Sequence, residues 1–353
     1  MPTLSKSGPF GMPLLVLVAL FCVIWSSAFA VSKLALADAP PLLLLTARFL
    51  IAGLAVLAVT IWWGSDWRLR PRDFASLAVI GIANNAVYLG LNYIGMRSVS
   101  SGVTALIASA NPVLTSLLAA LVLGEVLSWR KAIGLALGVG GVAYVVESRI
   151  AGGAESLIGI LFVTGGLVSL VAGTILFKRL APRSGLLVGN AVQNLAAGAA
   201  LAPFAFASES LGAIVPTWRL AGALLYLALL GSVCAYLIWL HLVTVAGAAA
   251  ASSFHFIMPP LGLAFGWLVL GEHATPTDFI GIVPVALGIY LVTQQAKPRE
   301  RIGAPRAAPA RKSSGLTSIS ATERRPPRVR RPRRCPVTVA TLPAEAPGRG
   351  STI

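Results

Sequence analysis

Arg48 is the residue of this chain whose position points most directly to chemistry. It stands seven residues into an apolar stretch that begins at residue 41, which places it roughly 10 Å along a membrane-spanning helix. An arginine at that depth is costly unless it is paired or faces water, so it marks a candidate functional site. Its guanidinium can bind a substrate carboxylate or gate a vestibule. The alternative is structural: it bonds backbone carbonyls or extends toward the membrane surface.

His255 is the second ionisable candidate, because it lies inside another apolar stretch, four residues before Pro259. A histidine titrates near physiological pH and can therefore couple proton movement to transport. A hydrogen-bonded packing histidine fits the same position. No Asp or Glu occupies the middle third of any apolar stretch, so a carboxylate proton relay is not expected.

Amides supply most of the other polar groups in the apolar stretches. They can bind a zwitterion or a sugar, or they can join helices at about 0.6 kcal/mol each. These residues are Asn84, Asn85, Asn92, Asn111, Asn190, Gln193 and Asn194. The first apolar stretch adds Trp25, which either lines a cavity or packs between helices, and Lys33, whose stem can reach the nearby interface.

Composition shows which elements must position these side chains. The mean hydropathy is +0.82 and 11% of the residues are charged, whereas soluble domains carry about a quarter charged residues. Stretches this long and apolar predict helices that cross a bilayer, and therefore an all-α polytopic membrane protein with ten transmembrane helices. The expected helices are 13–36, 41–63, 74–95, 101–123, 131–147, 156–177, 185–207, 220–242, 246–270 and 278–294.

An internal repeat divides the chain into two halves. Residues 121–125 and 268–272 both read Leu-Val-Leu-Gly-Glu, and the same offset of 147 pairs Pro112 with Pro259. Five helices per half reverse the second half in the membrane, so the duplication predicts two inverted five-helix repeats, in residues 1–147 and 156–294. Such repeats place a substrate site near the midplane and exchange conformations to give alternating access.

The repeat also pairs residues that could move or gate the halves. Pro112 and Pro259 should kink their helices at matching depths and free a carbonyl toward the cavity. Glu125 and Glu272 are the matched acids, and each follows a glycine at a helix end. A carboxylate there opposes the helix dipole, so it needs a compensating partner. The two acids act either as symmetric gates that bind loop cations or as stabilisers of their turns.

The distribution of charge predicts orientation. Lys and Arg gather in alternate loops, which places both termini in the cytoplasm of a multi-pass inner or plasma membrane protein. Residues 295–353 contain 14 Lys or Arg against 3 acids and many prolines. This composition predicts a disordered tail that contacts anionic lipid. Nucleic-acid binding is not expected, because no folded module accompanies the charge.

Several of these residues together resemble the EamA-type proteins of the drug/metabolite transporter superfamily. Trp25, Phe29 and Lys33 resemble a first-helix W-x-x-x-F-x-x-x-K pattern, and Arg48 stands in the second helix, where that family usually has an arginine. The remaining elements are Ala110-Asn111-Pro112 with Gly124-Glu125, Pro259 with Gly271-Glu272, and Tyr88 with Tyr236 in the third helix of each half. The resemblance covers roughly residues 13–294. The second half lacks a counterpart of Trp25, and the basic tail is outside the family pattern.

The resemblance implies ten helices, no cofactor and transport of small metabolites, often export of amino acids or related compounds. Uptake of small metabolites is the alternative direction. A channel is the runner-up within transport, but it would need a ring of charges or a filter-like loop, and neither appears in the sequence. An enzyme is not expected, because the three histidines lack metal-ligand spacing. ATP-driven transport is not expected either, because no P-loop sequence is present. A membrane receptor or scaffold is the non-transport alternative. The expected partners are a small-molecule substrate and lipid, without a metal, and a homodimer is left open.

Overall fold

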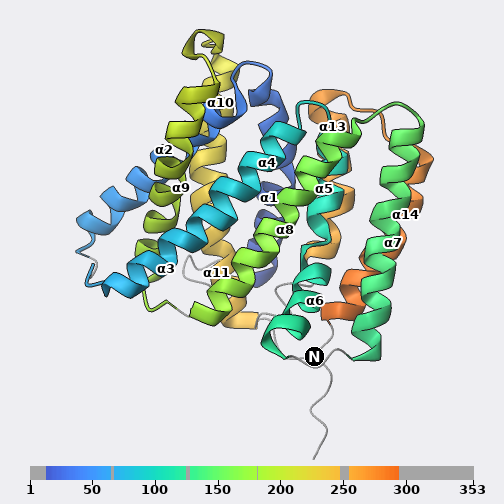
Figure 1. Cartoon of the computed structure of the whole chain (residues 1–353), viewed down its shortest axis with the longest axis horizontal. Coiled ribbons are helices and arrows are strands. Elements are labelled where there is room, and N and C mark those ends of the chain that lie inside the picture. The colour runs from blue at the N-terminus through green and yellow to red at the C-terminus, as the bar shows by residue number, and fades with distance from the viewer. Residues whose placement is uncertain (1–12, 65–66, 125–127, 181, 247–253, 294–353) are drawn as a thin grey trace, which may run out of the picture. The chain divides into compact units, whose positions relative to one another are not determined.

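Every regular element is a helix in the residues that the computed structural model describes, which are 13–64, 67–124, 128–180, 182–246 and 254–293 (Figure 1). The predicted polytopic, all-helical architecture is confirmed in this part of the chain. Glu125 and the basic tail, residues 295–353, lie outside the described residues, so the expectations for them stay predictions.

The first half is built from seven α-helices and one π-helix in the described residues. They are α1 (Leu14–Leu36), α2 (Pro41–Trp62), α3 (Pro71–Gly81), η1 (a π-helix, Ile82–Val87), α4 (Tyr88–Gly95), α5 (Ser101–Ser109), α6 (Asn111–Leu123) and α7 (Trp129–Ala151). The elements α3, η1 and α4 follow one another without a break and form one apolar stretch, Pro71–Gly95. The helices α5 and α6 are separated only by Ala110 and also form one apolar stretch, Ser101–Leu123.

The second half repeats this order with more irregular backbone. Its elements are α8 (Leu157–Leu180), α9 (Leu186–Ser208), η2 (a 3-10 helix, Leu211–Ala213), α10 (Trp218–Leu225), η3 (a π-helix, Tyr226–Cys234), α11 (Ala235–Ala246), η4 (a 3-10 helix, Phe254–Ile257), α13 (Met258–Leu270) and α14 (Pro276–Thr293).

Eight helical stretches of the described residues are long and apolar enough to cross a membrane. They run from Leu14 to Trp239 and agree with the first eight expected spans to within four residues at each end. Two shorter apolar helices follow, Met258–Leu270 and Pro276–Val292. The expected span 246–270 falls partly outside the described residues, and its described part starts with the 3-10 turn η4.

The offset of the sequence repeat recurs in the helix boundaries. The helices α10, α11, α13 and α14 begin 147 residues after α3, α4, α6 and α7. Gly124 and Gly271 end α6 and α13 in the left-handed conformation, with φ of 69° and 66°. Only glycine adopts this conformation without a steric penalty, so the shared Leu-Gly sequence stops both helices at the same point.

The two prolines begin helices instead of kinking them. Pro112 lies in the first turn of α6, after a break at Ala110, and Pro259 lies in the first turn of α13, after η4. A proline fits the first turn of a helix because the N–H it lacks would have no partner there. The expected kink within one helix is therefore a break between two short helices.

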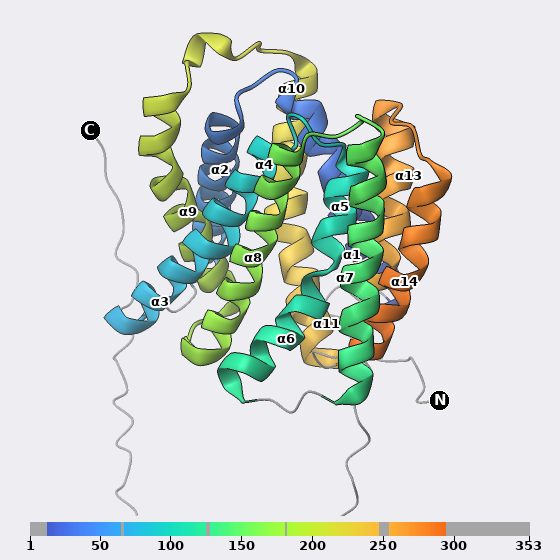
Figure 2. The same cartoon turned by 45° about the vertical axis from the view of Figure 1, so that its right-hand side comes forward.

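Matching glycines hold α7 against α14, which lie side by side in Figures 1 and 2. A Cβ on Gly134 would lie 2.7 Å from the carbonyl oxygen of Gly288, and one on Gly141 would lie 2.8 Å from that of Gly281. The repeat offset pairs Gly134 with Gly281 and Gly141 with Gly288. The contact is thus self-complementary, like the interface of a two-fold dimer, and small residues allow the close approach.

We expect Gly141→Val to destabilise the protein and Gly140→Val to leave its stability nearly unchanged. Gly141 is buried against α14, whereas nothing lies within 4 Å of a Cβ on Gly140. Overpacking a close contact costs about 1–3 kcal/mol. Thermal unfolding of both variants in nanodiscs measures the difference. Equal stability of the two variants would contradict the close α7–α14 contact.

Candidate functional site

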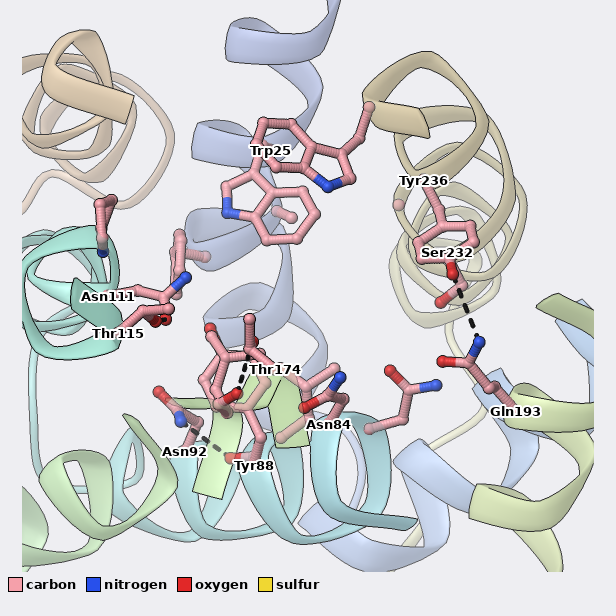
Figure 3. A pocket seen from close by; sticks show the side chains of 18 of the residues that line it. Trp25, Asn84, Tyr88, Asn92, Asn111, Thr115, Thr174, Gln193, Ser232 and Tyr236 are labelled. Carbon is pink, nitrogen blue, oxygen red and sulfur yellow. Dashed lines mark hydrogen bonds between the residues drawn. The ribbon is translucent and has the colours of Figure 1, made fainter. Parts of the chain in front are cut away.

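A cavity of about 490 Å³ lies among the helices and collects most of the predicted site residues (Figure 3). Its walls come from α1, α2, η1, α4, α6, α7, α8, α9, η3, α11 and α14. Its volume lies within the range of small-molecule sites, about 300–1,000 Å³. The predicted site residues that line it are Trp25, Arg48, Asn84, Tyr88, Asn111, Pro112, Gln193 and Tyr236.

Five predicted site residues do not line the cavity or are not described: Lys33, Glu125, His255, Pro259 and Glu272. Lys33 does not line the cavity: its ammonium donates to the carbonyl of Val99, in the connection between α4 and α5. The side chain of His255 and the whole of Glu125 lie outside the described residues. A proton-coupling role for His255 therefore stays a prediction.

The charged side chains of the described cavity lining are all cationic: Arg48, Lys131 and Lys178. No Asp or Glu is part of this lining. A cationic lining in a partly apolar cavity attracts anionic groups from the surrounding water.

Arg48 is held in one orientation by neutral partners. It is 6% exposed, its Nε donates to Ser232 Oγ at 3.0 Å, and its Nη1 donates to the hydroxyl of Tyr93 at 2.7 Å. The guanidinium carbon also lies 5.7 Å from the ring centre of Phe49. No acid is among these partners, so the charge of Arg48 is not compensated by them.

The chain of hydroxyls behind Arg48 has a fixed direction. Because a guanidinium can only donate, the Tyr93 oxygen accepts from it. Tyr93 then donates to Ser32 Oγ, 2.7 Å away, and Ser32 donates to the carbonyl of Ala28 at 2.6 Å. This chain connects α2 and α4 to α1 and orients Arg48 toward the cavity.

Several amides both line the cavity and join helices across it. Asn190 donates to the backbone carbonyl of Ser232 at 3.2 Å. Gln193 donates to the hydroxyl of Tyr236 at 3.3 Å (Figure 3). These bonds connect α9 to η3 and α11. The same amide residues can therefore both contact a substrate and join helices.

Two π-helices flank the cavity at matching points of the repeat. The helix η1 brings Asn84 and Asn85 to the cavity, and η3 brings Gly231 and Ser232. Their last residues, Val87 and Cys234, are 147 positions apart. Wide π-helical turns in proteins occur frequently at functional sites. Sequence reasoning missed them, because their composition does not differ from that of an α-helix.

Aromatic side chains form the wall of the cavity that α1 and α11 share. Phe21 stacks on Trp239 with ring centres 5.4 Å apart, and Trp25 packs against Phe21 at 5.6 Å. Trp25 thus both lines the cavity and packs between aromatic neighbours.

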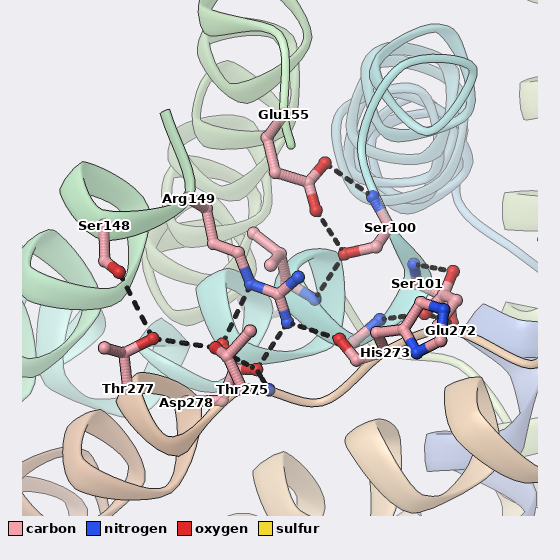
Figure 4. A network of polar contacts seen from close by, with 12 residues as sticks. Ser100, Ser101, Ser148, Arg149, Glu155, Glu272, His273, Thr275, Thr277 and Asp278 are labelled. Carbon is pink, nitrogen blue, oxygen red and sulfur yellow. Dashed lines mark hydrogen bonds and ion pairs between the residues drawn. The ribbon is translucent and has the colours of Figure 1, made fainter. Parts of the chain in front are cut away.

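Carboxylates accept hydrogen bonds from the start of α5 at one end of the molecule (Figure 4). Glu272 accepts from the N–H of Ser101 at 2.7 Å, from its hydroxyl at 2.8 Å and from the N–H of Gly102 at 3.1 Å. Glu155 accepts from the N–H and the hydroxyl of Ser100, at 2.9 and 2.6 Å. The first N–H groups of a helix have no partner within the helix, and Glu272 supplies one for two of them.

The hydrogen-bond partners of Glu272 differ from those that the sequence led us to expect, whereas a gating role stays a prediction. Its hydrogen-bond partners are the backbone and hydroxyl of a helix from the first half, neither loop cations nor its own turn. A negative charge at a helix N-terminus is also stabilised by the helix dipole. The dipole of α5 thus supplies the compensation that a carboxylate at the end of α13 requires.

Further acids at the same end tie other segments together. Arg149 near the end of α7 forms an ion pair with Asp278 at the start of α14. Glu209 accepts from the first N–H groups of α2, those of Leu42 and Leu43, at 3.0 and 2.8 Å. Sequence reasoning missed these acids, because an acid in a polar loop ordinarily faces solvent.

Asp38, in the connection between α1 and α2, pairs with Arg219 at the same end. Hydrogen bonds from Arg219 and from the hydroxyl of Thr217 hold the pKa of the Asp38 carboxyl below its usual range. The pair thus links this connection to the start of α10.

The cavity extends toward the opposite end of the molecule. Lys131 stands in the first turn of α7 and Lys178 in the last turn of α8, whereas the carboxylate contacts lie near the end of α7 and the start of α8. Lys178 is exposed and lines the cavity. The cavity therefore reaches the surface at the Lys178 end, whereas its lining residues toward the Glu272 end, such as Ser32 and Met96, are buried.

Comparisons with known proteins agree with this architecture. The model of the EamA-like transporter family matches residues 12–147 and 157–294. The uncharacterized transporter YvbV of Bacillus subtilis is 30% identical over 284 residues, which cover 80% of this chain and 92% of that protein. The uncharacterized inner membrane transporter YedA of Escherichia coli K12 is 28% identical over 277 residues, which cover 77% of this chain and 87% of that protein.

Two further comparisons concern a named substrate and a solved fold. An S-adenosylmethionine/S-adenosylhomocysteine transporter of Chlamydia muridarum is 25% identical over 295 residues, 78% of this chain and 90% of that protein. A crystal structure aligns with a TM-score of 0.60 at 20% identity, over 79% of this chain and 96% of the other. This last likeness shows the fold alone.

We expect Glu272→Ala to expose the start of α5 to hydrogen exchange. The substitution removes the acceptor of two N–H groups, and loss of a helix cap costs about 0.5–2 kcal/mol, or roughly 2- to 30-fold faster exchange. Hydrogen–deuterium exchange in nanodiscs measures this for the peptide that contains Ser101 and Gly102. Glu147→Ala is the matched control, because Glu147 is an exposed acid at the same end. Unchanged exchange in Glu272→Ala would show that the carboxylate does not hold α5.

Proposed function

Because the chain belongs to the EamA-like transporter family, we propose that it is a secondary transporter that exports small metabolites, amino acids or related compounds, by alternating access. The observation that carries this proposal is the cavity, which reaches the surface at the Lys178 end and is lined by buried residues toward the Glu272 end, where carboxylates cap helix starts. A carrier must bind its substrate in a site that opens to one side at a time. The confirmed membership in the family makes a non-enzymatic membrane transporter of small molecules the general class.

The proposed architecture is ten transmembrane helices in two inverted five-helix repeats, residues 1–147 and 156–294. The equal offsets of the helix starts support it, as does the self-complementary contact of Gly134 and Gly141 with α14. The eight long apolar stretches and the two shorter ones supply the ten helices. Pseudo-symmetric halves can exchange conformations at little cost, which is the usual basis of alternating access.

The proposed orientation places the Lys178 end in the cytoplasm. The excess of Lys and Arg in the loops of that end supports it, and both termini would then be cytoplasmic. The structure would correspond to the inward-open state, in which a substrate enters the cavity from the cytoplasm. Loading from that side is the first step of export.

Opening the other end would require the carboxylate caps to break. Each cap contributes about 0.5–2 kcal/mol, so the caps of Glu272, Glu155 and Glu209 together amount to a few kcal/mol. A ligand shifts an equilibrium between two states only by its difference in affinity for them. Differences of a few kcal/mol are within reach of a small metabolite, so the closed end can be both stable and reversible.

An amino-acid-like substrate has two supports. The cavity places a fixed guanidinium, Arg48, beside amides and aromatic side chains. The Chlamydia relative is named for S-adenosylmethionine, which itself carries an amino-acid group. Uptake in place of export remains the second candidate, because the same cavity would serve either direction.

Counterflow in proteoliposomes tests the proposed function. We expect purified protein to exchange one class among pooled labelled amino acids and small metabolites with saturable kinetics. An imposed pH gradient then tests proton coupling and the part of His255 in it. Vesicles without protein are the control. Absence of exchange by demonstrably folded protein, across all pools, would favour the receptor or scaffold alternative.

A further inference from the structure

We propose that the free face of Arg48, beside Gly231, is a carboxylate site that selects organic anions with an apolar or aromatic body and rejects the corresponding amines. The inference deepens the proposed function and rests on it in treating the cavity as a substrate site. The site requires a negative charge on the substrate and does not require an amino group.

The first support is the set of donors that Arg48 leaves unused. A guanidinium has five N–H groups in a planar fork. In the described residues, Nε and Nη1 bond Ser232 and Tyr93, and no acceptor faces Nη2. A carboxylate that approaches this nitrogen would form the charge-assisted hydrogen bond for which the fork is suited.

The second support is the glycine beside that nitrogen. Gly231 lines the cavity in η3, and a Cβ at this position would lie 3.2 Å from Nη2. Nothing else is recorded within 4 Å of that Cβ position. The glycine therefore leaves room at Nη2 that any other residue would fill. The free face of Arg48 is open toward the cavity for this reason.

The third support is the cost of the arrangement without a ligand. Arg48 is 6% exposed, and the described cavity lining contains no carboxylate to compensate it. Burying an uncompensated charge is unfavourable, and a ligand carboxylate would remove this cost. The hydroxyls of Tyr93 and Ser232 fix the guanidinium in place, so little side-chain entropy is lost when the anion binds.

The charge of the cavity also determines what it rejects. Lys131 adds positive charge toward the open end. An ammonium ligand would meet the cation of Arg48 and no acid of the described lining, whereas a carboxylate would be attracted to Arg48. The aromatic wall of Phe21, Trp25 and Trp239 would take the apolar body of the anion.

Four probes with one benzyl body separate the charges: phenylalanine, 3-phenylpropanoate, 2-phenylethylamine and phenylalaninamide. We expect the first two to raise the unfolding temperature of the purified wild-type protein with saturable dose dependence. The amine and the amide should leave it unchanged. Stabilisation by the amine equal to that by 3-phenylpropanoate would overturn the proposal, and so would no stabilisation by either carboxylate.

Variants then assign the effect to Arg48. We expect Arg48→Gln to weaken carboxylate binding about 10- to 100-fold, the range for loss of a charge-assisted hydrogen bond. Arg97→Gln removes an exposed arginine that does not line the cavity, and it should bind like the wild type. Unchanged binding by folded Arg48→Gln would overturn the proposal.

Gly231→Ala keeps the test valid if Arg48→Gln does not fold. This variant retains Arg48 and its two hydroxyl partners, and it should weaken carboxylate binding because its Cβ crowds Nη2. Gly222→Ala is the matched control, since a Cβ there meets nothing within 4 Å. Equal binding by the two alanine variants would overturn the proposal.

Carboxylate binding without counterflow of any metabolite would contradict the proposed function alone, whereas counterflow that Arg48→Gln leaves intact would contradict this inference alone.

Discussion

The N–H groups at the start of a helix need acceptors, and this requirement organises the closed end of the protein. Where water is excluded, an unsatisfied backbone group costs several kcal/mol. The carboxylate of Glu272 satisfies the start of α5, and that of Glu209 satisfies the start of α2. Lys33 bonds the carbonyl of Val99 just before α5 and brings α1 into the same arrangement. Polar closure of this kind is reversible, because water can replace each carboxylate when the end opens.

The parts of the fold that depend on local pattern could be predicted from the sequence. Hydropathy determines where helices cross the membrane, and the αL glycines Gly124 and Gly271 end helices wherever the same residues recur. Arg48 could be identified as a candidate because few positions tolerate an arginine in an apolar stretch. The partners of Lys33 could not, since they depend on the rotation of α1 against α5, which is set by tertiary packing.

The chemistry around Arg48 illustrates the same limit. Ser232 is 184 positions away in the chain, and it bonds Arg48 from the π-helix η3, which packs beside α2. Apolar composition does not distinguish a π-helical turn from an α-helical one. In the sequence Gly231 is one of many small residues, and only the structure shows that it lies beside the Arg48 guanidinium. Residue type is therefore readable from the sequence, whereas the geometry that makes it selective is not.

The absence of a carboxylate from the described cavity lining has an electrical consequence. With Arg48 as the buried cation, an empty cavity carries a positive charge that a bound monoanion neutralises. Reorientation of the empty protein then moves this charge through part of the membrane potential, where a full crossing is worth about 2.3 kcal/mol per 100 mV. In the proposed orientation, a potential that is negative inside draws the empty site back toward the cytoplasm, while the loaded site is nearly indifferent to it. The resting voltage of the cell would thereby reset the carrier after each release.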